Sequence, residues 1–189
     1  YRYNYMSANI PGIETFNEKK MNYYLDGRFV INKLALSNTP YAKTMEFYNT
    51  HKDCGTSSLY KPIDDRAKDG QGFGAFSIDK VPVVSLKMVL ERIDKTRFPT
   101  IGYVKIDAQG ADLDIIKSAG DQLKERIVWL TAEADGWQYE GASTCTEKNM
   151  DDYMISQGFE RVTHPNTQDP TYLNSTFKNI SDSIFVSQL

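Results

Sequence analysis

The stretch that decides the fold is Ile101-Gly-Tyr-Val-Lys-Ile-Asp107-Ala-Gln-Gly110-Ala-Asp-Leu-Asp-Ile-Ile-Lys-Ser-Ala119. Its first seven residues are rich in β-branched and aromatic side chains, which predicts a buried strand that ends in the carboxylate of Asp107. Ala111 to Ala119 predicts a helix, and Gly120 is the residue type that closes a helix at its carboxyl end. A buried strand followed at once by a helix is the repeating unit of a mainly parallel sheet.

Strand and helix patterns alternate along the rest of the chain. Arg126 to Glu133 is a second apolar strand that ends in a carboxylate, and Val81 to Val84 is a short strand before a helix that Ser85 caps. The alternation predicts one α/β domain over residues 1–189, with a mostly parallel sheet and helices on both faces. The other expected elements are strands at Tyr1–Met6, Arg28–Asn32, Thr44–Tyr48, Phe159–Thr163 and Ser183–Ser187, a helix at Met150–Gln157, and a loop or hairpin over Lys61–Lys80.

Composition and charge exclude several classes of function. The chain has 22 Lys and Arg against 25 Asp and Glu, and it has no dense basic run, so we expect no nucleic-acid partner. Apolar runs such as Ile127 to Leu130 are far shorter than the roughly 20 residues of a membrane span. Cys54 and Cys145 lack the spacing of a zinc site or a disulfide framework, so we expect free thiols in a reducing, cytoplasmic compartment. Because the chain starts with Tyr inside a strand pattern, we expect an excerpt of a longer multidomain protein.

Two carboxylates mark the expected site. Ligands of open α/β sheets bind beyond the carboxyl ends of the strands, and that rule selects Asp107 and Glu133. The alternative for each acid is that it caps the next helix or pairs with a Lys or Arg. Helical geometry turns Asp112 and Asp114 to different sides, so we predict no metal site.

The stretch from Lys105 to Ala119 is similar to the signature of the FkbM family of methyltransferases, a lysine-isoleucine-aspartate run followed by an acid or glutamine, a glycine and a helix. Four shorter segments resemble the family in the right order, and with them the likeness covers residues 1 to about 165. These segments are Leu34-Ala-Leu-Ser37, Gly55-Thr-Ser-Ser-Leu59, Val83-Val-Ser-Leu86 and Thr131-Ala-Glu133.

The resemblance implies a Rossmann-like class I methyltransferase fold, with strand order 3-2-1-4-5-7-6, an antiparallel last strand and S-adenosylmethionine bound across the strand ends. On this mapping Tyr1–Met6 is the second strand, and the first strand with its glycine-rich turn is absent. Met6 then stands where the family has an acid for the ribose hydroxyls, so either Asn4 or Asn9 substitutes or affinity is weak or lost. The implied cofactor contacts are Met6, Asn32, Leu34, Ala35 and Asp107.

The activity implied is O-methylation of a hydroxyl on a sugar, a glycan or another small molecule. Asp107 is expected at the interface of cofactor and substrate and Glu133 as a base; His164 is a further candidate base, although a lone loop histidine is more often solvated. Glycosyltransferase domains on the same polypeptide are a further expectation. The alternative is a catalytically silent module that binds glycan or protein. Trp137 lies between Asp135 and Tyr139, and its ring either faces a sugar or is anchored in the core. The expected substrate contacts are Gln109, Ser57, Ser58, Asp135, Tyr139 and Asn174.

Overall fold

The computed structural model describes residues 34–51, 54–63, 74–164 and 169–179. The chain divides into two units, Tyr1–Ala35 and Leu36–Leu189, and nearly all of the described residues belong to the second. The strands predicted at Tyr1–Met6, Arg28–Asn32 and Ser183–Ser187 lie outside the described residues, as do Met6 and Asn32. Among the described residues, no helix has the length and apolar character needed to cross a bilayer.

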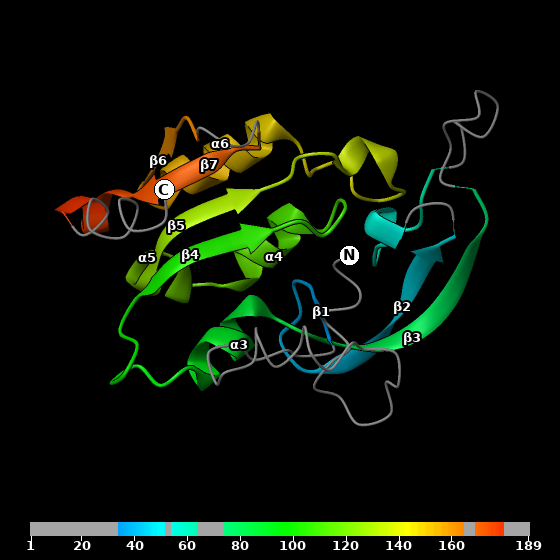
Figure 1. The fold of residues 1–189 in the computed structure, drawn as a ribbon, viewed down its shortest axis with the longest axis horizontal. Helices are drawn as coiled ribbons and strands as arrows, with labels where there is room; N and C mark the ends of the chain where they lie inside the picture. Colours follow the sequence, from blue (N-terminus) through cyan, green and yellow to red (C-terminus); the bar gives the residue numbers. More distant parts are fainter. Residues whose placement is uncertain (1–33, 52–53, 64–73, 165–168, 180–189) are drawn as a thin grey trace, which may run out of the picture. The chain divides into compact units, whose positions relative to one another are not determined.

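One sheet has four strands in the order β4-β5-β7-β6 (Figure 1). β4 (Ile101–Ile106) and β5 (Ile127–Ala132) are parallel, whereas β7 (Thr171–Asn174) is antiparallel to β5 and to β6 (Phe159–Val162). The predicted strands at β4, β5 and β6 are therefore confirmed.

β7 was not among the expected strands. Thr171, Tyr172, Leu173 and Asn174 are all buried, and two polar side chains among them have partners inside the sheet and at its edge. Thr171 Oγ1 lies 2.9 Å from Thr131 Oγ1, and Asn174 Nδ2 donates to the carbonyl oxygens of Lys124 and Ile127, both at 2.9 Å. A strand that buries hydroxyl and amide groups in this way does not show an apolar pattern in the sequence.

The other sheet has three strands in the order β1-β3-β2. β1 is Ala35–Leu36, and β2 (Lys43–Thr50) pairs antiparallel with β3 (Phe76–Val84) from Lys43 opposite Val83 to Thr50 opposite Phe76. A loop or hairpin was expected over Lys61–Lys80; of its two forms, the antiparallel pairing of β2 with β3 agrees with the hairpin, and the strand already includes Phe76–Lys80 because the whole of β2 supplies hydrogen-bond partners for a long β3. The two sheets are mixed, and a mostly parallel sheet is not what the described strands form.

The described residues include four helices. They are α3 (Leu86–Arg92), α4 (Asp112–Ser118), α5 (Gln122–Arg126) and α6 (Glu147–Ser156), and short 3-10 turns occur at η1 (Cys54–Thr56), η3 (Gly136–Gln138) and η4 (Ser175–Phe177). The predicted cap is confirmed, because Ser85 Oγ accepts a hydrogen bond from Met88 N at 3.2 Å. The chain is thus a mixed α/β protein, as expected.

The core lies on one face of the four-stranded sheet. Register pairs Val104 with Leu130 and Ile106 with Ala132, so these four side chains share that face. Apolar side chains from all four helices join them, among them Leu90, Leu113, Ile116, Leu123, Met150 and Met154. The alternate residues of β4 point to the other face, where Tyr103 is 41% exposed, so β4 is less buried than its sequence predicts.

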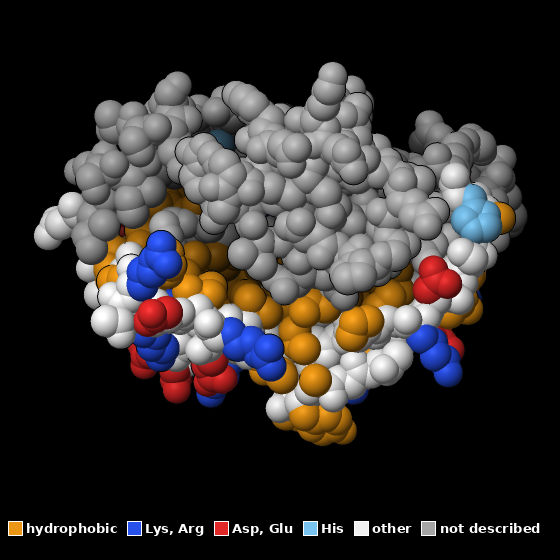
Figure 2. All heavy atoms as spheres, turned by 60° about the horizontal axis from the view of Figure 1, so that its bottom comes forward, with side chains coloured by type: hydrophobic (Ala, Val, Ile, Leu, Met, Phe, Trp, Pro, Cys, Tyr) orange, Lys and Arg blue, Asp and Glu red, His pale blue; other side chains and the backbone are white. Residues whose placement is uncertain are grey.

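The surface around α3 and β3 mixes all types of side chain. Figure 2 shows Lys and Arg (blue) interspersed with Asp and Glu (red) beside a band of apolar side chains (orange). Exposed apolar residues include Ile78 in β3 and Phe98 after α3.

A buried guanidinium joins α3 to the start of β5. Arg126 is almost fully buried, and its side chain donates to four backbone carbonyl oxygens: Leu90, Ile93 at 3.4 Å, Phe98 at 2.7 Å and Pro99 at 3.4 Å. These carbonyls belong to the end of α3 and the loop that leads into β4. Arg126 therefore holds in place the segment that sets where β4 begins.

We expect Arg126→Met to lower the free energy of unfolding by about 3 kcal/mol, because the carbonyl oxygens lose their donors while they stay buried. Urea denaturation at pH 7 measures the loss. Arg92→Met is the matched control, since Arg92 is exposed in the last turn of α3. Equal effects of the two substitutions would show that the buried hydrogen bonds contribute little.

Candidate functional site

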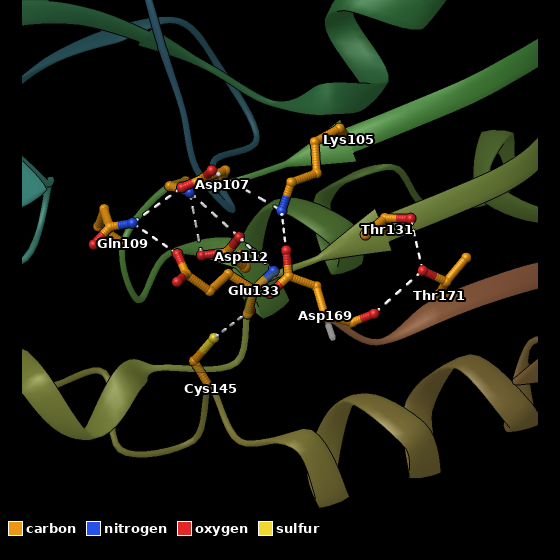
Figure 3. Close-up of polar contacts among 10 residues, drawn as sticks. Lys105, Asp107, Gln109, Asp112, Thr131, Glu133, Cys145, Asp169 and Thr171 are labelled. Atoms are coloured by element: carbon orange, nitrogen blue, oxygen red, sulfur yellow. Dashed lines mark hydrogen bonds and ion pairs between the residues drawn. The ribbon is translucent and has the colours of Figure 1, made fainter. Parts of the chain in front are cut away.

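The acids that end β4 and β5 lie side by side and share one amide (Figure 3). Gln109 Nε2 donates to Asp107 Oδ1 at 3.0 Å and to Glu133 Oε2 at 2.7 Å. Neither acid caps a helix: the residue at the start of α4 is Ala111, which makes no side-chain cap bond. The ion-pair alternative holds in part, because Lys105 Nζ lies 4.0 Å from Asp107 Oδ2.

A third carboxylate lies beneath this pair. Asp112, in the first turn of α4, is fully buried, and it accepts hydrogen bonds from the backbone N–H groups of Ala108 and Glu133, each at 3.3 Å. Burial raises the pKa of Asp112 to about 7, although the Ala108 amide works against that shift and the charge of Asp135 adds to it. Asp112 thus connects the residues that follow β4 and β5.

The turn between β4 and α4 needs an unusual backbone. Gln109 has φ +54° and Gly110 has φ +90°, and the second value suits glycine. A Cβ on Gly110 would lie 3.0 Å from Ala142 Cβ and 3.1 Å from Tyr139 Cδ2. Glycine is the expected residue at such a turn, whereas nothing in the sequence indicates the left-handed conformation of Gln109.

Several residues expected to contact substrate instead form a layer behind Gln109. Ser58 Oγ donates to the Gln109 carbonyl oxygen at 2.7 Å, and Tyr139 Oη lies 2.8 Å from Gln109 Oε1 and 3.0 Å from the Thr56 carbonyl oxygen. Ser58 and Tyr139 are each 1% exposed. Ser57 Oγ accepts from Thr50 N at 3.1 Å. These side chains fix the loop that carries Gln109.

Asp135 is buried as well. Its Oδ2 accepts from Gln138 Nε2 at 3.2 Å, and no hydrogen bond to its Oδ1 is found in the described ranges. Burial raises its pKa above the ordinary value, and the charges of Asp107 and Asp169 act in the same direction. Asp135 therefore acts on the site through its charge rather than as an exposed contact.

Glu133 is the half-buried member of the acid pair. Its Oε2 is held by Gln109, whereas its Oε1 makes no hydrogen bond within the part of the chain that the structure describes. Burial is the first cause that raises the pKa of Glu133 to about 7, and the charges of Asp135, Asp107, Asp112 and Asp169 follow. A carboxylate with one free oxygen and a pKa near neutrality can accept or hold a proton at physiological pH.

Lys105 and Asp169 belong to the site although sequence reasoning did not select them. Lys105 Nζ donates to Asp169 Oδ2 at 2.7 Å, and Asp169 stands just before β7. Because β7 is antiparallel to β5, its start lies at the edge where β5 ends. That rule would have found Asp169 had the strand been recognised.

The remaining candidates are placed elsewhere or not placed. Asn174 is buried at the start of β5, the edge opposite to Glu133, where it bonds to backbone carbonyls, so we do not retain it in the site. His164 follows β6, and β7 separates β6 from β5. Leu34 and Ala35 fall in the unit Tyr1–Ala35, and their role as cofactor contacts stays a prediction. Within the described ranges, no group of three His, Cys, Asp or Glu residues has metal-binding geometry.

Comparison with known proteins gives one match. The family model described as the methyltransferase FkbM domain matches residues 7–161, which is most of the chain. Neither a curated protein nor a solved structure matches the sequence. The matched range contains both acids, Gln109 and the layer behind it.

We expect Asp112 to make stability depend on pH. Its folded pKa of about 7 exceeds the ordinary value of 3.8, so its protonated form stabilises the fold below about pH 4, and this contribution is lost as the pH rises through 7. Relative to Asp112→Asn, the wild type should lose stability between pH 4 and 8 at up to about 1.4 kcal/mol per pH unit.

Urea titrations of wild type and Asp112→Asn across that pH range measure the difference. Asp121→Asn, at an exposed position just before α5, is the control. A difference between wild type and Asp112→Asn that stays constant with pH would contradict the shifted titration.

Proposed function

Because the chain belongs to the FkbM methyltransferase family, we propose that it transfers a methyl group from S-adenosylmethionine to a hydroxyl of a sugar, a glycan or another small molecule. The observation that carries this proposal is the acid pair at the ends of β4 and β5, with Glu133 Oε1 open beside an engaged Asp107. Transfer to a hydroxyl needs a base for the hydroxyl proton, and this oxygen suits that task.

The sheet supports a class I methyltransferase fold. Family resemblance implies the strand order 3-2-1-4-5-7-6 with an antiparallel last strand, which was expected at Ser183–Ser187. In the four-stranded sheet the order is β4-β5-β7-β6, and the antiparallel strand is β7, at Thr171–Asn174 instead. On this proposal residues 1–189 form one domain, and the strands expected at Tyr1–Met6 and Arg28–Asn32 stay predictions.

The charge at the site fits a cationic cofactor. S-adenosylmethionine carries a sulfonium cation, and Asp107, Asp135 and Asp169 each raise the pKa of Glu133 by repulsion, which a nearby cation would relieve. When bound, the cofactor supplies an electrophilic methyl group. We propose that Asp107 holds it together with the predicted contacts Met6, Asn32, Leu34 and Ala35.

The proton acceptor is Glu133. The acceptor hydroxyl loses its proton to Glu133 Oε1 as the oxygen gains the methyl group, so the carboxylate becomes a neutral acid. Its pKa of about 7 is close to the operating pH, where a general base is most effective. Gln109 keeps Oε2 occupied, so Oε1 is the atom left for this step.

A carbohydrate acceptor is supported by Trp137. It lies in η3, four residues after Glu133, and it is 56% exposed. Its loop is tightly held, because Gly136 N donates to the Cys145 carbonyl oxygen at 3.0 Å and a Cβ on Gly136 would clash with Cys145 and Ala142. An exposed indole on a rigid loop is suited to stack on the apolar face of a sugar.

The compartment and wider context are proposed with the activity. Cys145 is a free, buried thiol, and burial raises its pKa to about 11, which makes it an unreactive cysteine. A reducing, cytoplasmic compartment stays a proposal from the cysteine spacing alone. Linkage to glycosyltransferase domains stays a prediction.

We expect Glu133→Gln to lower kcat by about 10²–10⁴-fold because the proton loses its acceptor, while S-adenosylmethionine still binds. The measurement is transfer of an isotope-labelled methyl group to a panel of mono- and oligosaccharides, with calorimetry for cofactor binding. For the wild type, kcat/KM should rise with pH through about 7.

Glu160→Gln is the control, since Glu160 is exposed and pairs with Lys178. Binding of a glycan without any transfer by the wild type would sink the enzymatic proposal and favour a silent binding module. Near-normal turnover of Glu133→Gln would overturn Glu133 as the base.

We expect Trp137→Ala to raise KM for a carbohydrate acceptor by about 5–10-fold through loss of stacking, with little change in kcat, whereas Trp137→Phe retains most affinity. Steady-state kinetics with the best acceptor from the panel measures both variants. An unchanged KM in Trp137→Ala would remove the reason to place the sugar on this loop.

A further inference from the structure

The carboxamide of Gln109 has every polar atom engaged inside the protein. Its Nε2 gives one hydrogen bond to Asp107 Oδ1 at 3.0 Å and one to Glu133 Oε2 at 2.7 Å. Its Oε1 accepts from Tyr139 Oη at 2.8 Å. A primary amide has two donor hydrogens, so this side chain has none left for a substrate.

The backbone of Gln109 is fixed as firmly as its side chain. Ser58 Oγ donates to its carbonyl oxygen at 2.7 Å, and Ser58 is itself paired with Tyr48 through N–H···O bonds of 2.8 and 3.1 Å. With Gly110 packed on Tyr139 and Ala142, the left-handed turn has little room to shift. A residue held this way is suited to position its neighbours.

Negative charges surround Glu133, and the Gln109 amide offsets the repulsion between two of the acids. Asp107 after β4, Asp112 in α4, Asp135 after β5 and Asp169 before β7 all act on Glu133 through their charge. Lys105 pairs with Asp169 and approaches Asp107.

Without donors between them, Asp107 and Glu133 would repel each other and move apart. Two other buried titratable groups contact this site. Tyr139 donates to Gln109, and Cys145 Sγ lies 3.8 Å from the Glu133 carbonyl oxygen.

We infer that Gln109 is the positioning residue of this site: its carboxamide holds Asp107 and Glu133 in one arrangement and directs Glu133 Oε1 toward the acceptor. The catalytic half of this inference rests on the proposed function, whereas the arrangement itself does not. It replaces the expectation that Gln109 donates a hydrogen bond to substrate, since the amide has no hydrogen to spare.

Carboxyl carbon-13 NMR titration tests the arrangement without any need for activity. Gln109→Met keeps the length of the side chain and removes both donors, so the pKa of Glu133 should rise from about 7 by about one unit. Gln109→Glu adds a carboxylate and should raise it further. Tyr139→Phe, which frees Gln109 Oε1, gives a smaller rise and serves if the Gln109 variants do not fold. A Glu133 titration that is unchanged in Gln109→Met, or in Tyr139→Phe where only that variant folds, overturns the inference.

Kinetics tests the catalytic half. In Gln109→Met, kcat should fall about 10-fold or more with cofactor affinity unchanged, and the acidic limb of the pH–rate profile should move up by the same unit as the NMR titration. Gln122→Met, a buried glutamine in α5 before the opposite edge of β5, is the matched control and should leave the limb in place.

The outcomes separate the two proposals. A shifted titration in a protein that transfers no methyl group supports the positioning role and rejects the proposed function. An unshifted titration and profile in an active enzyme reject the positioning role and retain the function. A fall in kcat with no movement of the pH limb also rejects it, because a general loss of structure would give that result.

Discussion

The edge of the sheet where β4 and β5 end depends on the buried carboxylate of Asp112. It accepts the N–H groups of Ala108 and Glu133, one from the turn after each strand, so it fixes how far apart those turns lie. Burial of an acid without a cation is unfavourable, and the raised pKa of Asp112 reflects that cost. The same bonds set the separation of Asp107 and Glu133 that one Gln109 amide can bridge.

Behind the acids, contacts run from one sheet to the other. β2 holds Ser58 through two backbone hydrogen bonds at Tyr48, and Ser58 in turn holds the carbonyl of Gln109. Tyr139 Oη lies within donating distance of two acceptors, the Gln109 Oε1 of this amide and the Thr56 carbonyl oxygen, which share its one hydrogen. The three-stranded sheet thus contributes to the site through Ser58, whose buried hydroxyl reaches the Gln109 carbonyl oxygen.

The sequence was informative where a single segment determines its own structure. Apolar runs located β4 and β5, spacing and a serine cap located α3, and the strand-end rule selected Asp107 and Glu133. Prediction from the sequence failed where a segment is a strand only because another segment of the chain pairs with it. β7 buries Thr171 and Asn174 because Thr171 pairs with Thr131 and Asn174 donates to backbone carbonyls, and the first half of β3 is a strand because β2 lies beside it.

Residue type alone also could not tell a side chain that contacts substrate from one that holds other protein groups in place. Ser58, Gln109 and Tyr139 have the hydrogen-bonding groups expected of a sugar site, and those same groups bind protein partners here. What distinguishes the two roles is burial, and burial depends on how the loop after η1 packs on the turn before α4. The sequence shows which side chains can form hydrogen bonds, and the fold determines whether their partners are protein groups or substrate.

The electrostatics of this edge single out Glu133. Burial is the first cause that raises its pKa, and the charges of Asp135, Asp107, Asp112 and Asp169 add to that shift. The one cation at the rim, among the contacts of the described residues, is Lys105, which lies 2.7 Å from Asp169 and 4.0 Å from Asp107. Half-buried, repelled by its neighbours and held by Gln109 through one oxygen, Glu133 is the member of the bridged pair that exchanges a proton near neutrality.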